Sequence, residues 1–137
     1  MGGALADAIG GVKALTAVFI VAALALGGVS MAGSVEAALA LFVLAMLALG
    51  TGNGAVFQLV PQRFAAEIGV MTGLVGFAGG IGGFYLASSL GIAKQLTGSF
   101  SSGFLIFAAL SIVALTGLTL VKGGWRARWG AADTVRI

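Results

Sequence analysis

Four long apolar stretches follow one another along the chain, and short polar segments separate them. They cover residues 14–33, 37–60, 68–91 and 100–121, and none of the four contains a charged side chain. Apolar runs of about 18 residues or more are long enough to cross the hydrocarbon core of a bilayer as helices. The pattern therefore predicts an all-α integral membrane protein with four transmembrane helices.

The polar segments indicate where these helices begin and end. Pro61 follows the second stretch, and because proline has no N–H and restrains the residue before it, the helix is expected to stop or kink there. The chain begins with a glycine-rich segment (1–13) and ends with a basic tail (122–137). Between the apolar stretches lie a tight turn (34–36), a polar loop (62–67) and a longer polar connection (92–99). This division makes residues 14–121 the membrane region.

Composition excludes whole classes of function. Hydrophobic residues make up 60% of the chain and charged residues 8%, which excludes a soluble enzyme. The chain has no cysteine and no histidine, so it offers no disulfide, no thiolate and none of the commonest metal ligands. The four acidic residues are too scattered along the sequence to suggest a carboxylate pair. We therefore expect no enzymatic activity, no metal and no cofactor.

The positions of the seven Lys and Arg residues indicate an orientation in the membrane. All but one fall on the side of the N-terminus, the 62–67 loop and the C-terminal tail, and only Lys94 falls on the opposite side. Because cations in short loops stay in the cytoplasm, both termini are expected to be cytoplasmic. Cations beside long apolar spans indicate a lipid bilayer, and not a nucleic acid, as the partner.

The third apolar stretch is dense in glycine. Alternating steps of four and three residues place five of its glycines on one helix face: Gly69, Gly73, Gly76, Gly80 and Gly83. Glycine costs a soluble helix about 1 kcal/mol relative to alanine, but in lipid unpaired backbone groups cost more, so a helix remains the prediction. Two interpretations stay open, since either a neighbouring helix or a small solute can approach such a face closely.

A polar residue interrupts the second apolar stretch. Asn53 lies past its midpoint, between glycines at positions 50, 52 and 54 that allow other helices to come near. Polar side chains within spans usually face the interior of the helix bundle. Asn53 is therefore expected either to make an interhelical hydrogen bond, worth about 0.6–2 kcal/mol, or to line the path of a solute.

Two motifs in these stretches carry a resemblance to a known family. They read Gly50-x-Gly-Asn-Gly-x-x-Phe-Gln-x-x-Pro-Gln-x-Phe64 and Gly69-x-x-Thr-Gly-x-x-Gly-x-x-Gly-Gly-x-Gly-Gly-Phe84. Together they resemble the nitrate/nitrite porters of the major facilitator superfamily, and Ala78–Phe84 looks like the second glycine-rich nitrate signature of that family, in its eleventh helix. Gly3-x-Leu-Ala-Asp7-x-x-Gly10 is similar to the superfamily's cytoplasmic loop motif. The resemblance covers nearly the whole chain.

This resemblance implies a fold, and it implies which part of that fold the chain would form. The chain would correspond to loop 8–9 and helices nine to twelve, the C-terminal portion of a twelve-helix major facilitator fold. Three features depart from the family pattern. Ala8 replaces the basic residue that usually follows the loop aspartate, Ala87 stands where a proline is often found, and the arginines with which the family grips nitrate, in helices two and eight, would precede this chain.

The resemblance also implies a function, which is secondary transport of nitrate or nitrite across a bacterial inner (plasma) membrane. The partners would be the anion, the bilayer and the missing N-terminal helices of the transporter. Residues implied to line the substrate pathway are Asn53, Gly76, Gly79, Gly80, Gly82 and Gly83. Residues implied in helix packing or gating are Asp7, Gly50, Gly52, Gly54, Gly69 and Gly73.

The alternative is a self-contained four-helix membrane protein, acting as a structural partner or as a small homo-oligomeric carrier. A small exporter needs an ionisable coupling group within a span, whereas Glu36 and Glu67 both fall in predicted loops. This observation favours the porter fragment over the exporter.

Overall fold

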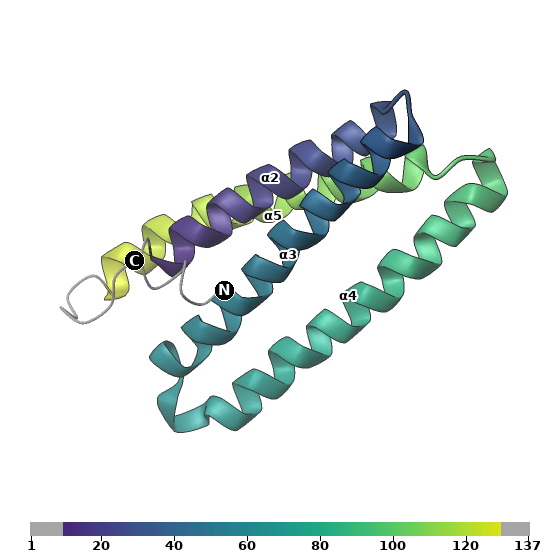
Figure 1. The fold of residues 1–137 in the computed structure, drawn as a ribbon. Helices are drawn as coiled ribbons and strands as arrows, with labels where there is room; N and C mark the ends of the chain where they lie inside the picture. Colours follow the sequence, from purple (N-terminus) through teal and green to yellow (C-terminus); the bar gives the residue numbers. More distant parts are fainter. Residues whose placement is uncertain (1–9, 130–137) are drawn as a thin grey trace.

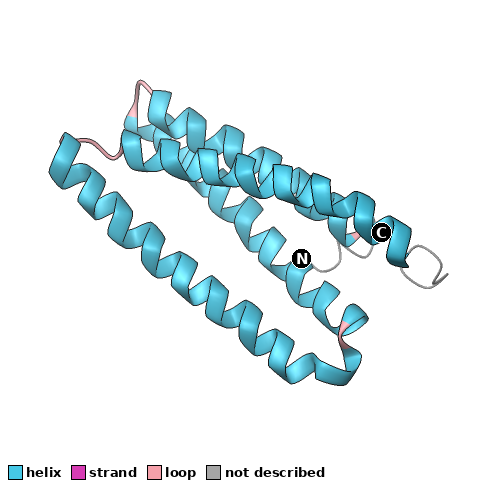
Figure 2. Ribbon diagram, turned by 180° about the vertical axis from the view of Figure 1, so that it is seen from behind, coloured by secondary structure: helices cyan, strands magenta, loops and turns pink. Residues whose placement is uncertain are grey.

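The computed structural model describes residues 10–129, except for the side chains at 62, 63 and 122–129. The described chain consists of helices and short connections (Figures 1 and 2). Each of the four long helices is long and apolar enough to cross a membrane, which confirms the predicted all-α class with four membrane-spanning helices. In chain order the elements are α2 (Gly11–Met31), α3 (Val35–Arg63), the 3-10 turn η1 (Ala65–Glu67), α4 (Ile68–Thr97) and α5 (Ser101–Trp129).

Helix α2 is the centre of the packed part of the molecule. It contacts α3 on one side and α5 on the other, and the three helices form an elongated bundle (Figure 1). Two clusters of buried apolar side chains hold it together, and both are rich in alanine, which lets the helices approach closely. The first cluster contains Ala14, Leu15 and Ala55, and the second contains Ala25, Leu26, Ala45 and Ala108.

Two specific side-chain contacts show how these helices are aligned with one another. A Cβ added at Gly52 of α3 would lie 2.8 Å from Cγ1 of Val18 on α2, so the valine occupies the space that a side chain at 52 would need. Between α3 and α5, the rings of Phe42 and Phe104 meet edge to face with centroids 5.9 Å apart. These contacts among α2, α3 and α5 form without any residue of α4.

Helix α4 is arranged differently. It is joined to the other helices through its two ends and runs beside the bundle (Figures 1 and 2). It contacts α3 and α5 among the described elements, and none of its residues is buried. The glycine-rich helix α4 is thus the helix that the rest of the described chain covers least.

The expectation that the second helix stops or kinks at Pro61 needs a correction. Helix α3 continues through Pro61 and ends at Arg63, with Phe64 as its C-terminal cap. Proline removes only its own N–H from the ladder, and the next turn still closes because the Phe64 N–H donates to the carbonyl of Val60 at 2.9 Å. The predicted 62–67 loop is shorter for the same reason, and η1 occupies its second half.

The predicted polar connection at residues 92–99 is also wrong in most of its length. Helix α4 continues to Thr97 because residues 92–97 contain no glycine or proline, and it ends at Gly98, whose φ of 72° is the left-handed conformation of a helix cap. The turn at 34–36 is shorter than expected, since Ser34 caps α3 by accepting a hydrogen bond from the Ala37 N–H at 3.2 Å. Helix α5 runs past the predicted end at Val121 to Trp129.

Candidate functional site

The candidate residues lie on two helices that follow each other in the sequence. Asn53 and its flanking glycines are on α3, and the glycine face is on α4, with the turn around η1 between them (Figure 1). Asp7, the third candidate element, lies outside the described residues. The structure does not bring Asn53 into contact with the α4 glycines, none of which has a non-neighbouring atom within 4 Å of an added Cβ.

The Asn53 side chain is exposed on α3. Its neighbour Gly52 is buried against Val18 of α2, so the close helix contact forms on one side of α3 and the amide is displayed on another. Within the described part of the chain, the Asn53 amide makes no hydrogen bond, and the interhelical bond considered from the sequence is not formed there. Gly50, one turn before Asn53, is exposed as well, with nothing within 4 Å of an added Cβ.

The glycine face of α4 is open along its whole length. An added Cβ would meet no atom within 4 Å at any of the predicted positions on this helix, which are Gly69, Gly73, Gly76, Gly79, Gly80, Gly82 and Gly83. Large apolar side chains on the same helix are also exposed, for example Phe77 at 70% and Phe84 at 74%. The partner that the sequence predicts for this face is therefore not a helix in the described part of this chain.

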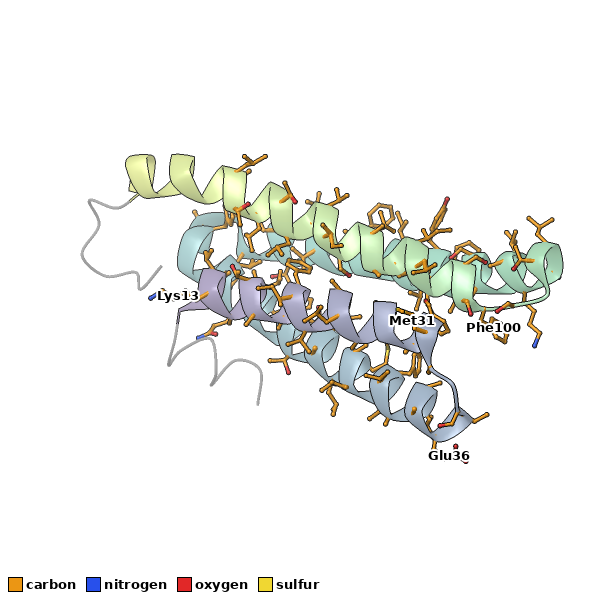
Figure 3. The ribbon with its side chains drawn as sticks, turned by 90° about the horizontal axis from the view of Figure 1, so that it is seen from above. Lys13, Met31, Glu36 and Phe100 are labelled. Carbon is orange, nitrogen blue, oxygen red and sulfur yellow. The ribbon has the colours of Figure 1, made fainter. Side chains whose placement is uncertain are left out.

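Charged side chains lie at the ends of the bundle. Lys13 is at one end, and Glu36 and Phe100 are at the other (Figure 3). Lys94 belongs to the second end, because its Nζ lies 4.4 Å from the centre of the Phe100 ring. Within the described helices, residues 14–60, 68–91 and 101–121 contain no Lys or Arg. The uncharged polar side chains of these segments are therefore the amides of Asn53 and Gln58 and the hydroxyl groups of Ser, Thr and Tyr85.

The same end of the bundle contains a polar cluster that the sequence analysis did not single out. It lies where α4 turns into α5, and its hydroxyl groups hydrogen-bond to one another and to the backbone. The sequence signal was present, because glycine after a helix and serine before the next one are common caps. The residues concerned are Thr97, Ser99, Ser101 and Ser102.

Curated transporters resemble this chain in sequence over most of its length. The chain is 38% identical over 122 residues to a nitrite extrusion protein of Bacillus subtilis and 35% identical over 118 residues to a probable nitrate transporter, NarT, of Staphylococcus carnosus. The chain is homologous to the C-terminal part of these two proteins. The matches include 88% and 84% of this chain, and the resemblance expected from the two glycine motifs is confirmed.

The chain spans about 30% of the length of the curated relatives that it matches, in their C-terminal part. A second NarT protein, from Staphylococcus haemolyticus, is 35% identical over 114 residues and is covered to the same extent. No family profile and no solved structure matches the chain. The relatives are transporters, which agrees with the expectation that this chain is not an enzyme.

Proposed function

We propose that these four helices are the C-terminal part of a secondary transporter that moves nitrate, nitrite or both. The observation that carries the proposal is the similarity of nearly the whole chain to a nitrite extrusion protein and to probable nitrate transporters. The four apolar helices support a site in the membrane. The absence of Lys and Arg from the described spans fits a role in which other helices of the porter hold the anion.

In this proposal α2, α3 and α5 form a static scaffold, and the open faces of α3 and α4 line the substrate pathway. An amide facing hydrocarbon without a partner is costly, so the exposed Asn53 needs a polar environment on its side of α3. A water-filled path, or a polar group of a helix outside this chain, meets that need. Asn53 then supplies a hydrogen bond to the passing anion or orders water beside it.

The open face of α4 receives a helix from the rest of the porter. Major-facilitator-type transporters bind substrate near the bilayer midplane between two helical bundles, and one bundle rocks against the other. A glycine face lets a helix slide at close range, because no side chains interlock. Gly76, Gly79, Gly80, Gly82 and Gly83 also bring backbone next to the anion path in this arrangement. Asp7 would brace the cytoplasmic gate.

The orientation belongs to the same proposal. Both termini and the turn around η1 face the cytoplasm, and the turn between α4 and α5 faces the opposite side of the plasma membrane. The support is the distribution of Lys and Arg, because Lys94 is the one cation on the α4–α5 side.

The test is anion uptake by the protein expressed from its complete reading frame and reconstituted in vesicles. The proposal predicts saturable nitrate uptake that nitrite inhibits and sulfate does not, since a planar monovalent anion differs from a divalent tetrahedral one in both charge and shape. Empty vesicles give the background. A protein that moves neither nitrate nor nitrite would contradict the proposal, and uptake of all three anions alike would contradict the assignment of substrate.

A further inference from the structure

The turn from α4 to α5, residues 90–103, is closed by contacts that lie entirely within this chain. We call these residues the α4–α5 corner. The Gly98 N–H donates to the carbonyl of Lys94 at 2.9 Å and closes the end of α4. The Ser101 N–H donates to Oγ of Ser99 at 3.1 Å and caps the start of α5. Each helix end thus has a backbone group that is bonded within the corner itself.

Side chains connect the two helices across the corner. The hydroxyl oxygens of Thr97 and Ser102 lie 3.2 Å apart, within hydrogen-bonding distance. The ammonium group of Lys94 sits over the ring of Phe100 at the end of the bundle where Figure 3 labels this residue. The two residues of each pair lie on opposite sides of Gly98, so both pairs oppose separation of the helices.

Apolar contacts continue the connection toward the membrane interior. A Cβ added at Gly103 of α5 would lie 2.7 Å from Cδ2 of Leu90 and 3.4 Å from the Cβ of Ala93, both on α4. Gly103 is buried, so the absence of a side chain here lets α4 and α5 touch directly. The corner is also tied to α2, because the Ser30 hydroxyl donates to the carbonyl of Ser101 at 3.1 Å.

The remainder of α4 has no comparable contacts. Its glycines between positions 69 and 83 have no atom of another element within 4 Å of an added Cβ. The corner is therefore held by contacts within this chain, whereas the glycines of α4 outside the corner have no such contacts among the described residues.

We propose that the α4–α5 corner is a clamp that stays closed through the transport cycle, so that α4 moves only by displacing its glycine-rich part relative to the scaffold. The second half of this statement rests on the proposed transport function. The first half concerns the distance between two helices and holds for any function of the chain. A closed corner makes α5 and α2 the fixed reference against which the open face of α4 changes position.

Cysteine pairs test the clamp directly, because these 137 residues contain no cysteine. The double variant Thr97→Cys with Ser102→Cys is made in the protein expressed from its complete reading frame, and each single variant is the control. A disulfide needs an S–S distance of about 2.0 Å, within reach of two hydroxyl positions that are 3.2 Å apart. Spin labels on the same two cysteines, in a separate sample, report their distance without locking the corner.

The clamp predicts rapid and complete disulfide formation under mild oxidation, and a single short distance between the labels that nitrate and nitrite leave unchanged. Nitrate uptake by the oxidised double variant should stay within about twofold of the reduced protein. A second, longer distance, incomplete disulfide formation, or a loss of uptake that reductant reverses would overturn the proposal. Absence of uptake in the unsubstituted protein would count against the transport function alone, because the distance measurement still decides whether the corner is closed.

Discussion

The contact between Gly52 and Val18 gives the sharpest prediction for the scaffold. In Gly52→Ala, the new Cβ would lie 2.8 Å from Cγ1 of Val18, whereas carbon atoms prefer a separation of about 3.5–4.0 Å. Val18 cannot easily yield, because it is buried and a β-branched side chain in a helix strongly prefers one χ1 rotamer. Helices α2 and α3 must then move apart by several tenths of an ångström, which loosens the alanine contacts beside them.

The magnitude follows from comparing two glycines of the same helix. Overpacking a well-packed contact costs about 1–3 kcal/mol. Replacing glycine by alanine also changes helix propensity, by up to about 1 kcal/mol in the favourable direction. Gly50→Ala carries the same change of propensity but no clash, because nothing lies within 4 Å of its added Cβ. Gly52→Ala should therefore be less stable than Gly50→Ala by about 1–3 kcal/mol.

The assay is unfolding of the purified protein in mixed micelles, with helix content followed as the fraction of denaturing detergent rises. Adding Val18→Ala to Gly52→Ala removes the clashing methyl group, so the two changes should be non-additive, with the double variant more stable than the sum of its parts by about 1 kcal/mol or more. Equal stability of Gly52→Ala and Gly50→Ala would refute the reasoning, because it would mean that α2 and α3 do not meet at this contact.

Three further predictions concern the protein expressed from its complete reading frame. In membranes, Ser99→Cys should react with an impermeant thiol reagent from outside and Gln62→Cys should not, and labelling of position 62 from outside would reverse the proposed orientation. Gly80→Leu should abolish nitrate uptake because a large side chain forces a partner helix away from α4, whereas Leu74→Ala should be milder; equal tolerance would mean that the glycine face contacts lipid. Asn53→Leu should reduce uptake by about tenfold, if a lost hydrogen bond of about 1.4 kcal/mol is what the amide supplies, and an unchanged rate would remove Asn53 from the pathway.

The architecture could be predicted from the sequence because the length of each apolar stretch dominates every other local preference. The helix ends were less predictable. The last turn around Pro61 is held by a hydrogen bond from the Phe64 N–H to the Val60 carbonyl, because one proline does not outweigh the remaining backbone hydrogen bonds. Helix α4 likewise continues past Lys94 to Thr97. The end of a helix depends on where the next capping residue lies. For α4 this residue is Gly98, and the polar residue Lys94 before it does not end the helix.

The residues of the candidate site could be identified from the sequence, but the helices that they contact could not. The spacing of the α4 glycines showed that they share a face, yet the glycines that take close contacts inside this chain include Gly52 and Gly103. Sequence periodicity identifies a face and says nothing about which helix covers it. The exposure of Asn53 likewise depends on the direction of the α2–α3 contact, which only the three-dimensional packing of Gly52 on Val18 determines.

The most direct test of the central claim is nitrate flux into vesicles that contain these 137 residues alone, compared with vesicles that also contain the remaining helices of the proposed porter as a separate chain. An anion that leaves water retains a solvation penalty of several kcal/mol in a protein. Helical N–H groups are already bonded four residues back, so the described spans offer little to offset it. The account predicts no flux from the short chain alone and saturable flux when the second chain is present. Saturable nitrate uptake by the 137-residue chain on its own would contradict the account and favour a homo-oligomeric carrier.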